Sequence, residues 1–146
     1  MSNYKTILVA IDINADYRSV IEKALSICKS SKDLTLGYIS LSAIYIQPLL
    51  YGAEYSHVDD AGRLDSARDQ LAKIGAEFGI VAQQVLLRTG NAADEIKNIA
   101  SDIEADLIVI GTHGRSGIKL LLGSTANAVL HGAKQDVLAV RIHEYK

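Results

Sequence analysis

The sequence is poor in cysteine and proline, and neither sign of charge dominates it. Its 146 residues include a single cysteine, Cys28, so a disulfide within the chain is excluded, as expected for a protein of the reducing cytosol. The formal net charge is −2, which argues against a nucleic-acid-binding protein that works through bulk positive charge. A local site for an anion remains compatible with this balance.

Long apolar runs and a targeting segment are also missing. The opening "MSNYKTILVAI" passes directly into a short apolar run, without the charged segment and apolar core of a signal peptide. No stretch approaches the roughly 20 apolar residues that a membrane span needs. Because 49% of the residues are hydrophobic and 22% are charged, a packed core is expected. We therefore expect a soluble, cytoplasmic protein with one domain over residues 1–146.

What the chain does contain is an alternation of two patterns. Short apolar runs predict strands at 5–11, 34–40, 84–88, 106–111 and 136–142. Several of them are apolar on both faces, which is typical of strands covered by helices on both sides. Helical spacing of apolar residues separates these runs, at 16–31, 59–78, 91–103 and after Gly123. This alternation predicts an α/β fold built from βαβ units around a parallel sheet.

Individual residues refine the predicted helices. Asn91 is expected to cap the helix at 91–103, and Gly132 is expected to mark the end of the last helix. Ala126, Val129, Leu130 and Ala133 predict the buried stripe of that last helix. Cys28 falls on the apolar stripe of the first helix and is interpreted as a small core residue.

The segment 41–58 does not fit the alternation. It holds the sole proline, Pro48, and three of the seven tyrosines, and it is long for a connection between a strand and a helix. Two interpretations remain open: a mobile flap or contact surface, and a loop packed by its own aromatic side chains.

The stretch "GTHGRSGIKLLLGST", residues 111–125, follows the strand at 106–111 and carries no acidic residue. Glycines allow the backbone to approach an anion closely, and a helix N-terminus presents unpaired N–H groups with a partial positive charge. The hydroxyls of Ser124 and Thr125 and the charges of Arg115 and Lys119 would add to such a phosphate cradle. In the alternative interpretation the glycines serve turns and packing, Ser124 caps the helix, and no ligand binds.

Asp12 ends the first predicted strand, at the same edge of the sheet. Ligands of open α/β sheets bind beyond the carboxyl ends of the strands, where a carboxylate is well placed for ribose hydroxyls. In the alternative interpretation, Asp12 caps the helix that follows. Taken together with 111–125, it points to a nucleotide.

Several other classes of site lack their defining residues. The Walker pattern, a G-x-G-x-x-G after the first strand and a G-x-S-x-G elbow are all absent. A phosphoacceptor receiver would need an Asp after the third strand and a Lys after the fifth, and the chain has neither. His57, His113, His131 and His143 are scattered without ligand spacing, so no metal site made by protein side chains alone is expected. The pair Asp59 and Asp60 is interpreted as a solvated helix start.

The stretch 111–125 with the following "ANAVLHGAKQDVLAVR", together with the opening "YKTILVAID", resembles the universal stress protein family over nearly the whole chain. The resemblance implies a three-layer Rossmann-like domain with a five-stranded parallel sheet of order 3-2-1-4-5 and helices on both faces. It also implies a homodimer joined through the last strand, 136–142. The charge balance and the lack of a membrane span predict no nucleic acid or membrane as partner.

One branch of that family binds ATP, and the resemblance to this branch implies a nucleotide site. Adenine and ribose would lie near the ends of the first two strands, and the glycine stretch would surround ribose and phosphates. The implied nucleotide-binding residues are Ala10, Ile11, Asp12, Ile39, Ile110, Gly111, Thr112, His113, Gly114, Arg115, Gly123, Ser124 and Thr125. The expected ligand is ATP, or AMP or ADP in its place, with Mg²⁺ accompanying the phosphates.

Two features depart from the ATP-binding pattern. Eight residues, "RSGIKLLL", separate Gly114 from Gly123, where that pattern usually has nine, and Asp136 stands where many members have proline. Asp136 and the segment 41–58 resemble the branch that binds no nucleotide, but that branch lacks the glycines.

Two functional hypotheses follow from this comparison. In the first, the protein is an ATP-binding stress sensor or adaptor that is not an enzyme, with at most slow hydrolysis because no general base is evident. In the second, it is a nucleotide-free dimer that acts through protein contacts. An adenylate-forming transferase or hydrolase would be a third class, but it lacks any recognisable catalytic motif.

Overall fold

The computed structural model describes residues 4–40, 60–112 and 124–142. Its strands are β1 (Ile7–Ile11), β2 (Leu34–Ser40), β3 (Val85–Thr89), β4 (Leu107–Gly111) and β5 (Asp136–Val140). Its helices are α1 (Tyr17–Ile27), α3 (Asp60–Glu77), α4 (Ala92–Asp102) and α5 (Ser124–Gly132), with short 3-10 turns η1 (Ser31–Asp33) and η3 (Ala82–Gln84). Each predicted strand and helix is therefore present, with small shifts at the ends. The segment 41–58, on which two interpretations were open, lies outside the described residues.

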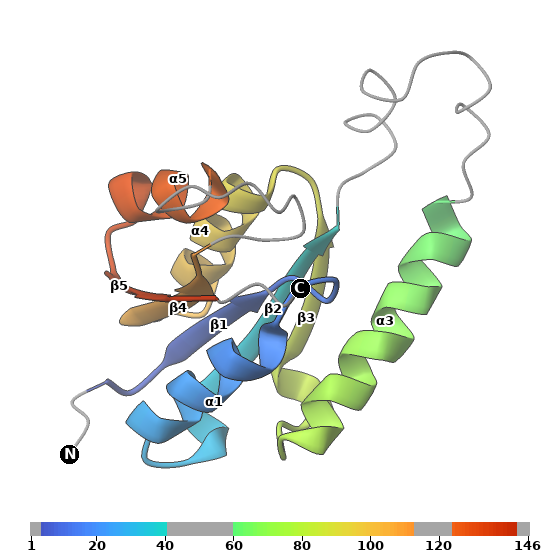
Figure 1. The fold of residues 1–146 in the computed structure, drawn as a ribbon, viewed down its shortest axis with the longest axis horizontal. Helices are drawn as coiled ribbons and strands as arrows, with labels where there is room; N and C mark the ends of the chain where they lie inside the picture. Colours follow the sequence, from blue (N-terminus) through green and yellow to red (C-terminus); the bar gives the residue numbers. More distant parts are fainter. Residues whose placement is uncertain (1–3, 41–59, 113–123, 143–146) are drawn as a thin grey trace.

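The strands form one parallel sheet in the order β3-β2-β1-β4-β5, as the resemblance implied. The chain runs outward from β1 through β2 to β3 and then crosses back to place β4 on the other side of β1 (Figure 1). The order therefore reverses between β1 and β4. In open α/β sheets, the crevice at such a reversal is where ligands bind.

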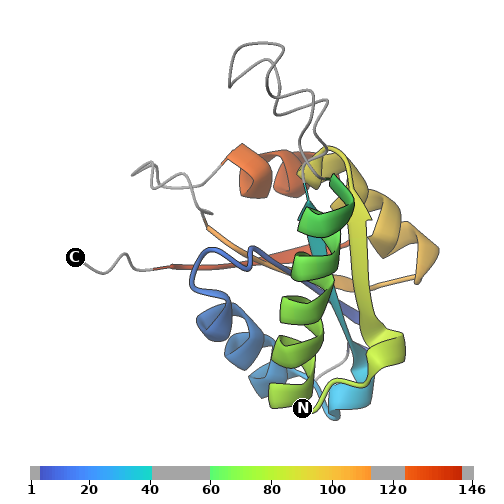
Figure 2. The same cartoon turned by 90° about the vertical axis from the view of Figure 1, so that its right-hand side faces the viewer.

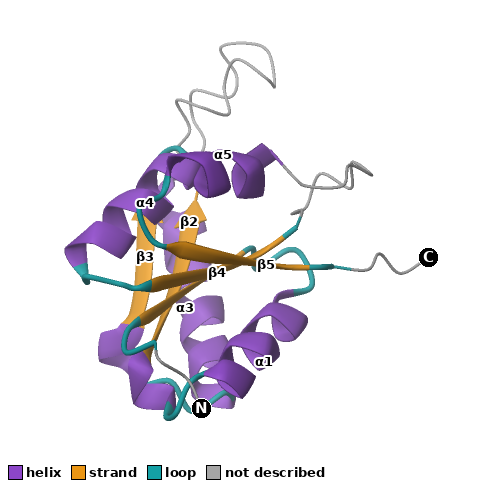
Figure 3. Cartoon of the chain, turned by 90° about the vertical axis from the view of Figure 1, so that its left-hand side faces the viewer, coloured by secondary structure: helices purple, strands orange, loops and turns teal. Residues whose placement is uncertain are grey.

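Helices cover both faces of the sheet, which makes three layers. Figures 2 and 3 show α1 and α3 on one face and α4 and α5 on the other. Each face has its own core: Ile7 and Val9 of β1 point toward α1, whereas Leu8 and Ala10 point toward α4 and α5. This alternation along β1 explains why its sequence is apolar at every position.

β1 is the most completely buried element of the sheet. Ile7, Leu8 and Val9 have no exposed surface, and the neighbouring β4 residues Ile108 and Val109 have none either. Burying one side chain of this size contributes about 1.5–3 kcal/mol to folding. The two central strands, β1 and β4, are thus held rigidly by the core, and the candidate site lies at their carboxyl ends.

The predicted cap of α4 is confirmed. The side-chain oxygen of Asn91 accepts a hydrogen bond from the backbone N–H of Asp94 at 3.0 Å. Gly132 is the last residue of α5, also as predicted. α1 ends at Ile27, earlier than the predicted 31, because the backbone of Cys28 is extended. Ser30 then caps the separate turn η1 by accepting from the N–H of Lys32.

One core prediction is wrong. Leu130 was placed in the buried stripe of α5, but 46% of its surface is exposed. α5 lies at the side of the sheet against β5 and α4, so only a narrow face of it is covered. Ala126 and Val129 fill that face, and the neighbouring helical position turns toward solvent.

Candidate functional site

A cavity of about 1030 Å³ lies over the carboxyl ends of β1, β2 and β4. Its size is at the upper end of the range for small-molecule sites, about 300–1000 Å³. The described lining comes from the ends of these strands, from the N-terminal turns of α1, α4 and α5, and from the polar side chains of α3. The cavity therefore occupies the place that the order reversal of the sheet predicts.

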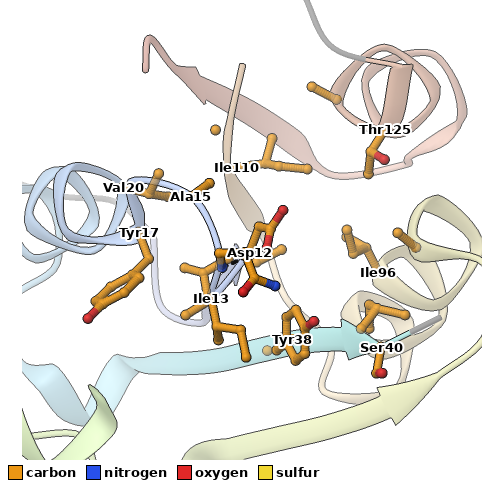
Figure 4. Close-up of a pocket in the computed structure, with 18 of the residues that line it drawn as sticks. Asp12, Ile13, Ala15, Tyr17, Val20, Tyr38, Ser40, Ile96, Ile110 and Thr125 are labelled. Carbon is orange, nitrogen blue, oxygen red and sulfur yellow. Dashed lines mark hydrogen bonds between the residues drawn. The ribbon is translucent and has the colours of Figure 1, made fainter. Parts of the chain in front are cut away.

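Asp12 follows β1 and lies in the middle of this cavity. Figure 4 shows it beyond the end of the strand, with Tyr17 and Ile13 on one side and Ile110 and Thr125 on the other. Its Oδ1 accepts a hydrogen bond from the backbone N–H of Asn14 at 2.9 Å. This bond holds one oxygen of the carboxylate in place at the cavity.

The alternative role of Asp12 as the cap of α1 is wrong, because Asp16 fills that position. Asp16 accepts from the backbone N–H of Ser19 at 3.2 Å and from its hydroxyl at 2.6 Å. Asp12 is therefore not needed to start the helix. Its carboxylate is placed at the cavity by the strand, as a ligand-binding role requires.

Three helix N-termini face the cavity, and their charges differ. Asp16 caps α1, and the first turn of α4 carries Asp94 and Glu95. The first turn of α5 carries no acidic residue, and its Ser124 and Thr125 both line the cavity. Because a helix N-terminus has a partial positive charge, the α5 end is the favourable one for an anion, whereas the other two already hold carboxylates.

The end of β5 completes the cavity on the side of β4. Thr112 donates its backbone N–H to Val140 at 2.9 Å, and its Oγ1 accepts from the N–H of Ile142 at 3.1 Å. Thr112 and Ile142 are both buried, and Ile142 lines the cavity. A Cβ on Gly111 would overlap the side chain of Ile142 and would lie 3.3 Å from Cγ2 of Val20. Close packing by these two side chains is therefore one reason for a glycine at this position.

Most of the predicted site residues meet at this cavity. Those that line it are Ala10, Ile11, Asp12, Ile39, Ile110, Gly111, Ser124 and Thr125. Thr112 is described but does not line it. His113, Gly114, Arg115 and Gly123 lie outside the described residues. The shared location agrees with the predicted nucleotide site, while the role of each residue stays a prediction.

Sequence reasoning missed part of the wall. α3 contributes Arg63, Ser66 and Gln70, β2 contributes Tyr38, and α4 contributes its first turn from Asn91. Tyr38 and Asn91 follow the same rule that selected Asp12, because both stand at carboxyl ends of strands in one edge of the sheet. The polar residues of α3 carry no comparable signal in the sequence.

The described wall carries several ionisable side chains. Its described members include the carboxylates of Asp12, Asp16 and Asp94 and the guanidinium of Arg63. Across the described ranges, no three His, Cys, Asp or Glu side chains are grouped so that they could hold a metal ion. Over the same residues, no helix is long and apolar enough to cross a membrane.

Comparisons with known proteins agree with this architecture. The model of the universal stress protein family matches residues 3–141. Universal stress protein A homolog 2 of Coxiella burnetii is 42% identical over 97% of this chain and 98% of its own. Two solved structures share the fold at 22% identity, each over 97% of this chain and 99–100% of their own chains. They are the hypothetical protein MJ0577, with a TM-score of 0.80, and a universal stress protein in complex with cAMP, with a TM-score of 0.59.

Proposed function

The chain belongs to the universal stress protein family, and we propose from this premise that its cavity binds an adenine nucleotide: ATP, or AMP or ADP in its place. The observation that carries the proposal is the cavity itself. It opens at the reversal of strand order, with Asp12 at its centre and the acid-free first turn of α5 at one side. Asp12 would accept hydrogen bonds from ribose hydroxyls, and the N–H groups of Ser124 and Thr125 would face phosphate oxygens.

Mg²⁺ would enter with the phosphates rather than through a site of its own. The described side chains offer no ready-made metal cluster, and Mg²⁺ commonly keeps several waters while it binds phosphate oxygens. We assign the protein a cytoplasmic role as a stress sensor or adaptor, in which the bound nucleotide sets an interaction surface. We expect any hydrolysis to be slow, because the sequence contains no recognisable motif for a general base.

Thermal unfolding with increasing Mg-ATP tests the proposal. A ligand that binds only the folded state stabilises it by about 2.7 kcal/mol at a hundredfold excess over Kd. The melting temperature of the protein should therefore rise with ATP, and AMP, ADP and cAMP should compete to measurable extents. An unchanged melting temperature at millimolar Mg-ATP would contradict nucleotide binding.

Two matched substitutions sharpen this test. Asp12→Asn removes the charge of the central carboxylate and should weaken ATP binding about tenfold or more, because hydrogen bonds to charged groups contribute about 1.5–3 kcal/mol. Asp102→Asn makes the same chemical change at the far end of α4, where Asp102 pairs with Arg88 at 3.0 Å outside the cavity. It should leave ATP binding as in the parent protein.

A further inference from the structure

Thr112 stands apart from the other described site residues because it is the one among them that does not line the cavity. Only 7% of its surface is exposed, and its hydroxyl oxygen accepts from the backbone of Ile142. Its backbone N–H donates to the carbonyl of Val140. One residue beyond β4 thus binds two positions at the end of β5 and extends the pairing of these strands past their ends.

This contact holds the backbone of Ile142. With its N–H held by Thr112, the side chain of Ile142 packs over Gly111, in the space that a Cβ at Gly111 would need. Ile142 is 9% exposed, belongs to the core beneath α1, and lines the cavity. The end of β5 is therefore part of the cavity wall, although no residue of it was predicted to belong to the site.

β5 is also the edge strand of the described sheet, paired with β4 on one side only. An edge strand offers free N–H and C=O groups to a partner strand. Residues 140–142 therefore connect the cavity with this edge: Ile142 lines the cavity, and Val140 is the last residue of β5. Thr112 binds both residue 140 and residue 142, so it connects the position of Ile142 to the backbone of β5.

We propose that Thr112 is a positioning residue of the nucleotide site, which holds Ile142 as one wall of the cavity and thereby transmits ligand occupancy to the β5 edge. The proposal rests on the nucleotide-binding function proposed above. It assigns Thr112 no contact with the ligand. Thr112 affects the ligand only through the position of Ile142. Gly111 has no Cβ, and this leaves the space that the side chain of Ile142 fills.

The test follows backbone amide resonances of ¹⁵N-labelled protein during titration with Mg-ATP. In the parent protein, the amides of Asp12 in the cavity and Ala139 on the edge should shift together, with one common Kd. Thr112→Val removes the acceptor and should weaken ATP binding about fivefold, the equivalent of one neutral hydrogen bond. The Asp12 amide should still shift in this variant at higher ATP, whereas the Ala139 amide should stay in place.

Two further variants separate positioning from a general loss of structure. Thr112→Ser keeps the hydroxyl and should restore both the parent Kd and the shift at Ala139. Thr89→Val makes the same exchange at the exposed end of β3, at a residue that does not line the cavity, and should change neither. If Thr112 had only a structural role, Thr112→Val would lower the melting temperature, but the amides of Asp12 and Ala139 would still shift together during the ATP titration.

A variant that crowds Ile142 tests independently whether the packing of this side chain against Gly111 supports ATP binding. Gly111→Ala places a methyl group against Ile142 and should weaken ATP binding. The double change Gly111→Ala with Ile142→Val removes Cδ1 of Ile142, the atom nearest the new methyl group, and should recover most of the affinity.

The outcomes distinguish the two proposals. If ATP shifts the amide of Asp12 but not that of Ala139 in the parent protein, the role of Thr112 is overturned and nucleotide binding stands. Equal shifts at Ala139 in the parent protein and Thr112→Val overturn it as well. If no amide shifts at saturating Mg-ATP, nucleotide binding fails and the coupling fails with it.

Discussion

Cys28 lies directly after α1, and its thiol is partly shielded from solvent. It follows the last residue of α1, packs partly against the core, and its thiol lies 3.5 Å from the carbonyl oxygen of Leu25, to which it donates. Burial raises the pKa of the Cys28 thiol, and the charge of Asp33 adds to this effect. The prediction of a small core residue is thus correct in kind, although the residue is only partly buried.

The raised pKa predicts slow chemistry at Cys28. Because the thiolate is the reactive form, modification of the folded protein by a disulfide reagent at neutral pH should be several-fold slower than that of the unfolded chain, and it should accelerate above the ordinary thiol pKa. Ser26→Cys with Cys28→Ser moves the thiol to an exposed position of the same helix and should react rapidly. Equal rates for the two folded proteins would contradict the prediction.

At the level of elements, a local side chain sets the N-terminus of α4, so the sequence revealed it, whereas Asp16, the cap of α1, was not identified. Asn91 caps α4 through the N–H of Asp94. Asn91→Ala should lower the free energy of unfolding by about 1 kcal/mol, because one N–H group at the helix start loses its partner. Urea unfolding measures this loss. Asn91→Ser keeps a capping oxygen and should lie close to the parent protein, and a loss of the same size in both variants would argue against capping.

The positions of the strands within the sheet were harder to predict from the sequence. The alternation of strands and helices predicted a parallel sheet, but the strand order came from the family resemblance, because periodicity carries no information about neighbours. Leu130 was misassigned for a related reason: spacing marks the apolar side of α5 but not how much of it the sheet covers. Ile142 was missed because its role depends on the pairing of β4 with β5 and on Thr112, residues that are distant in sequence.

At the scale of the whole molecule, the edge of β5 that has no partner strand in the described sheet predicts association of two copies. Hydrogen-bonding groups alternate along a strand, and Val140 and Ile142 direct theirs toward β4 and Thr112. The backbone N–H and C=O of Ala139, the residue directly before Val140, therefore point toward the open edge. Sedimentation should show a dimer for the parent protein and for Ala139→Ser. Ala139→Pro removes the outward N–H without removing a bond to β4, and it should yield monomer. A monomeric parent protein at high concentration would contradict pairing through this edge.

The distribution of burial over the sheet predicts how the whole molecule opens. β1 and β4 lie in the middle, with side chains that have almost no exposed surface, whereas β3 and β5 form the edges and are only partly buried. Amides of β1 and β4 should therefore exchange with solvent only through global unfolding, and amides of the edge strands should exchange faster through local opening.

Because the nucleotide cavity spans the ends of β1, β2 and β4, no part of it can bind ligand once the central strands separate. Mg-ATP at a hundredfold excess over Kd should then slow exchange at Leu8 and Val109 by about a hundredfold, the kinetic equivalent of about 2.7 kcal/mol. Native-state hydrogen exchange measures this directly, and equal protection of central and edge strands without ligand would show that the core does not unfold as we infer.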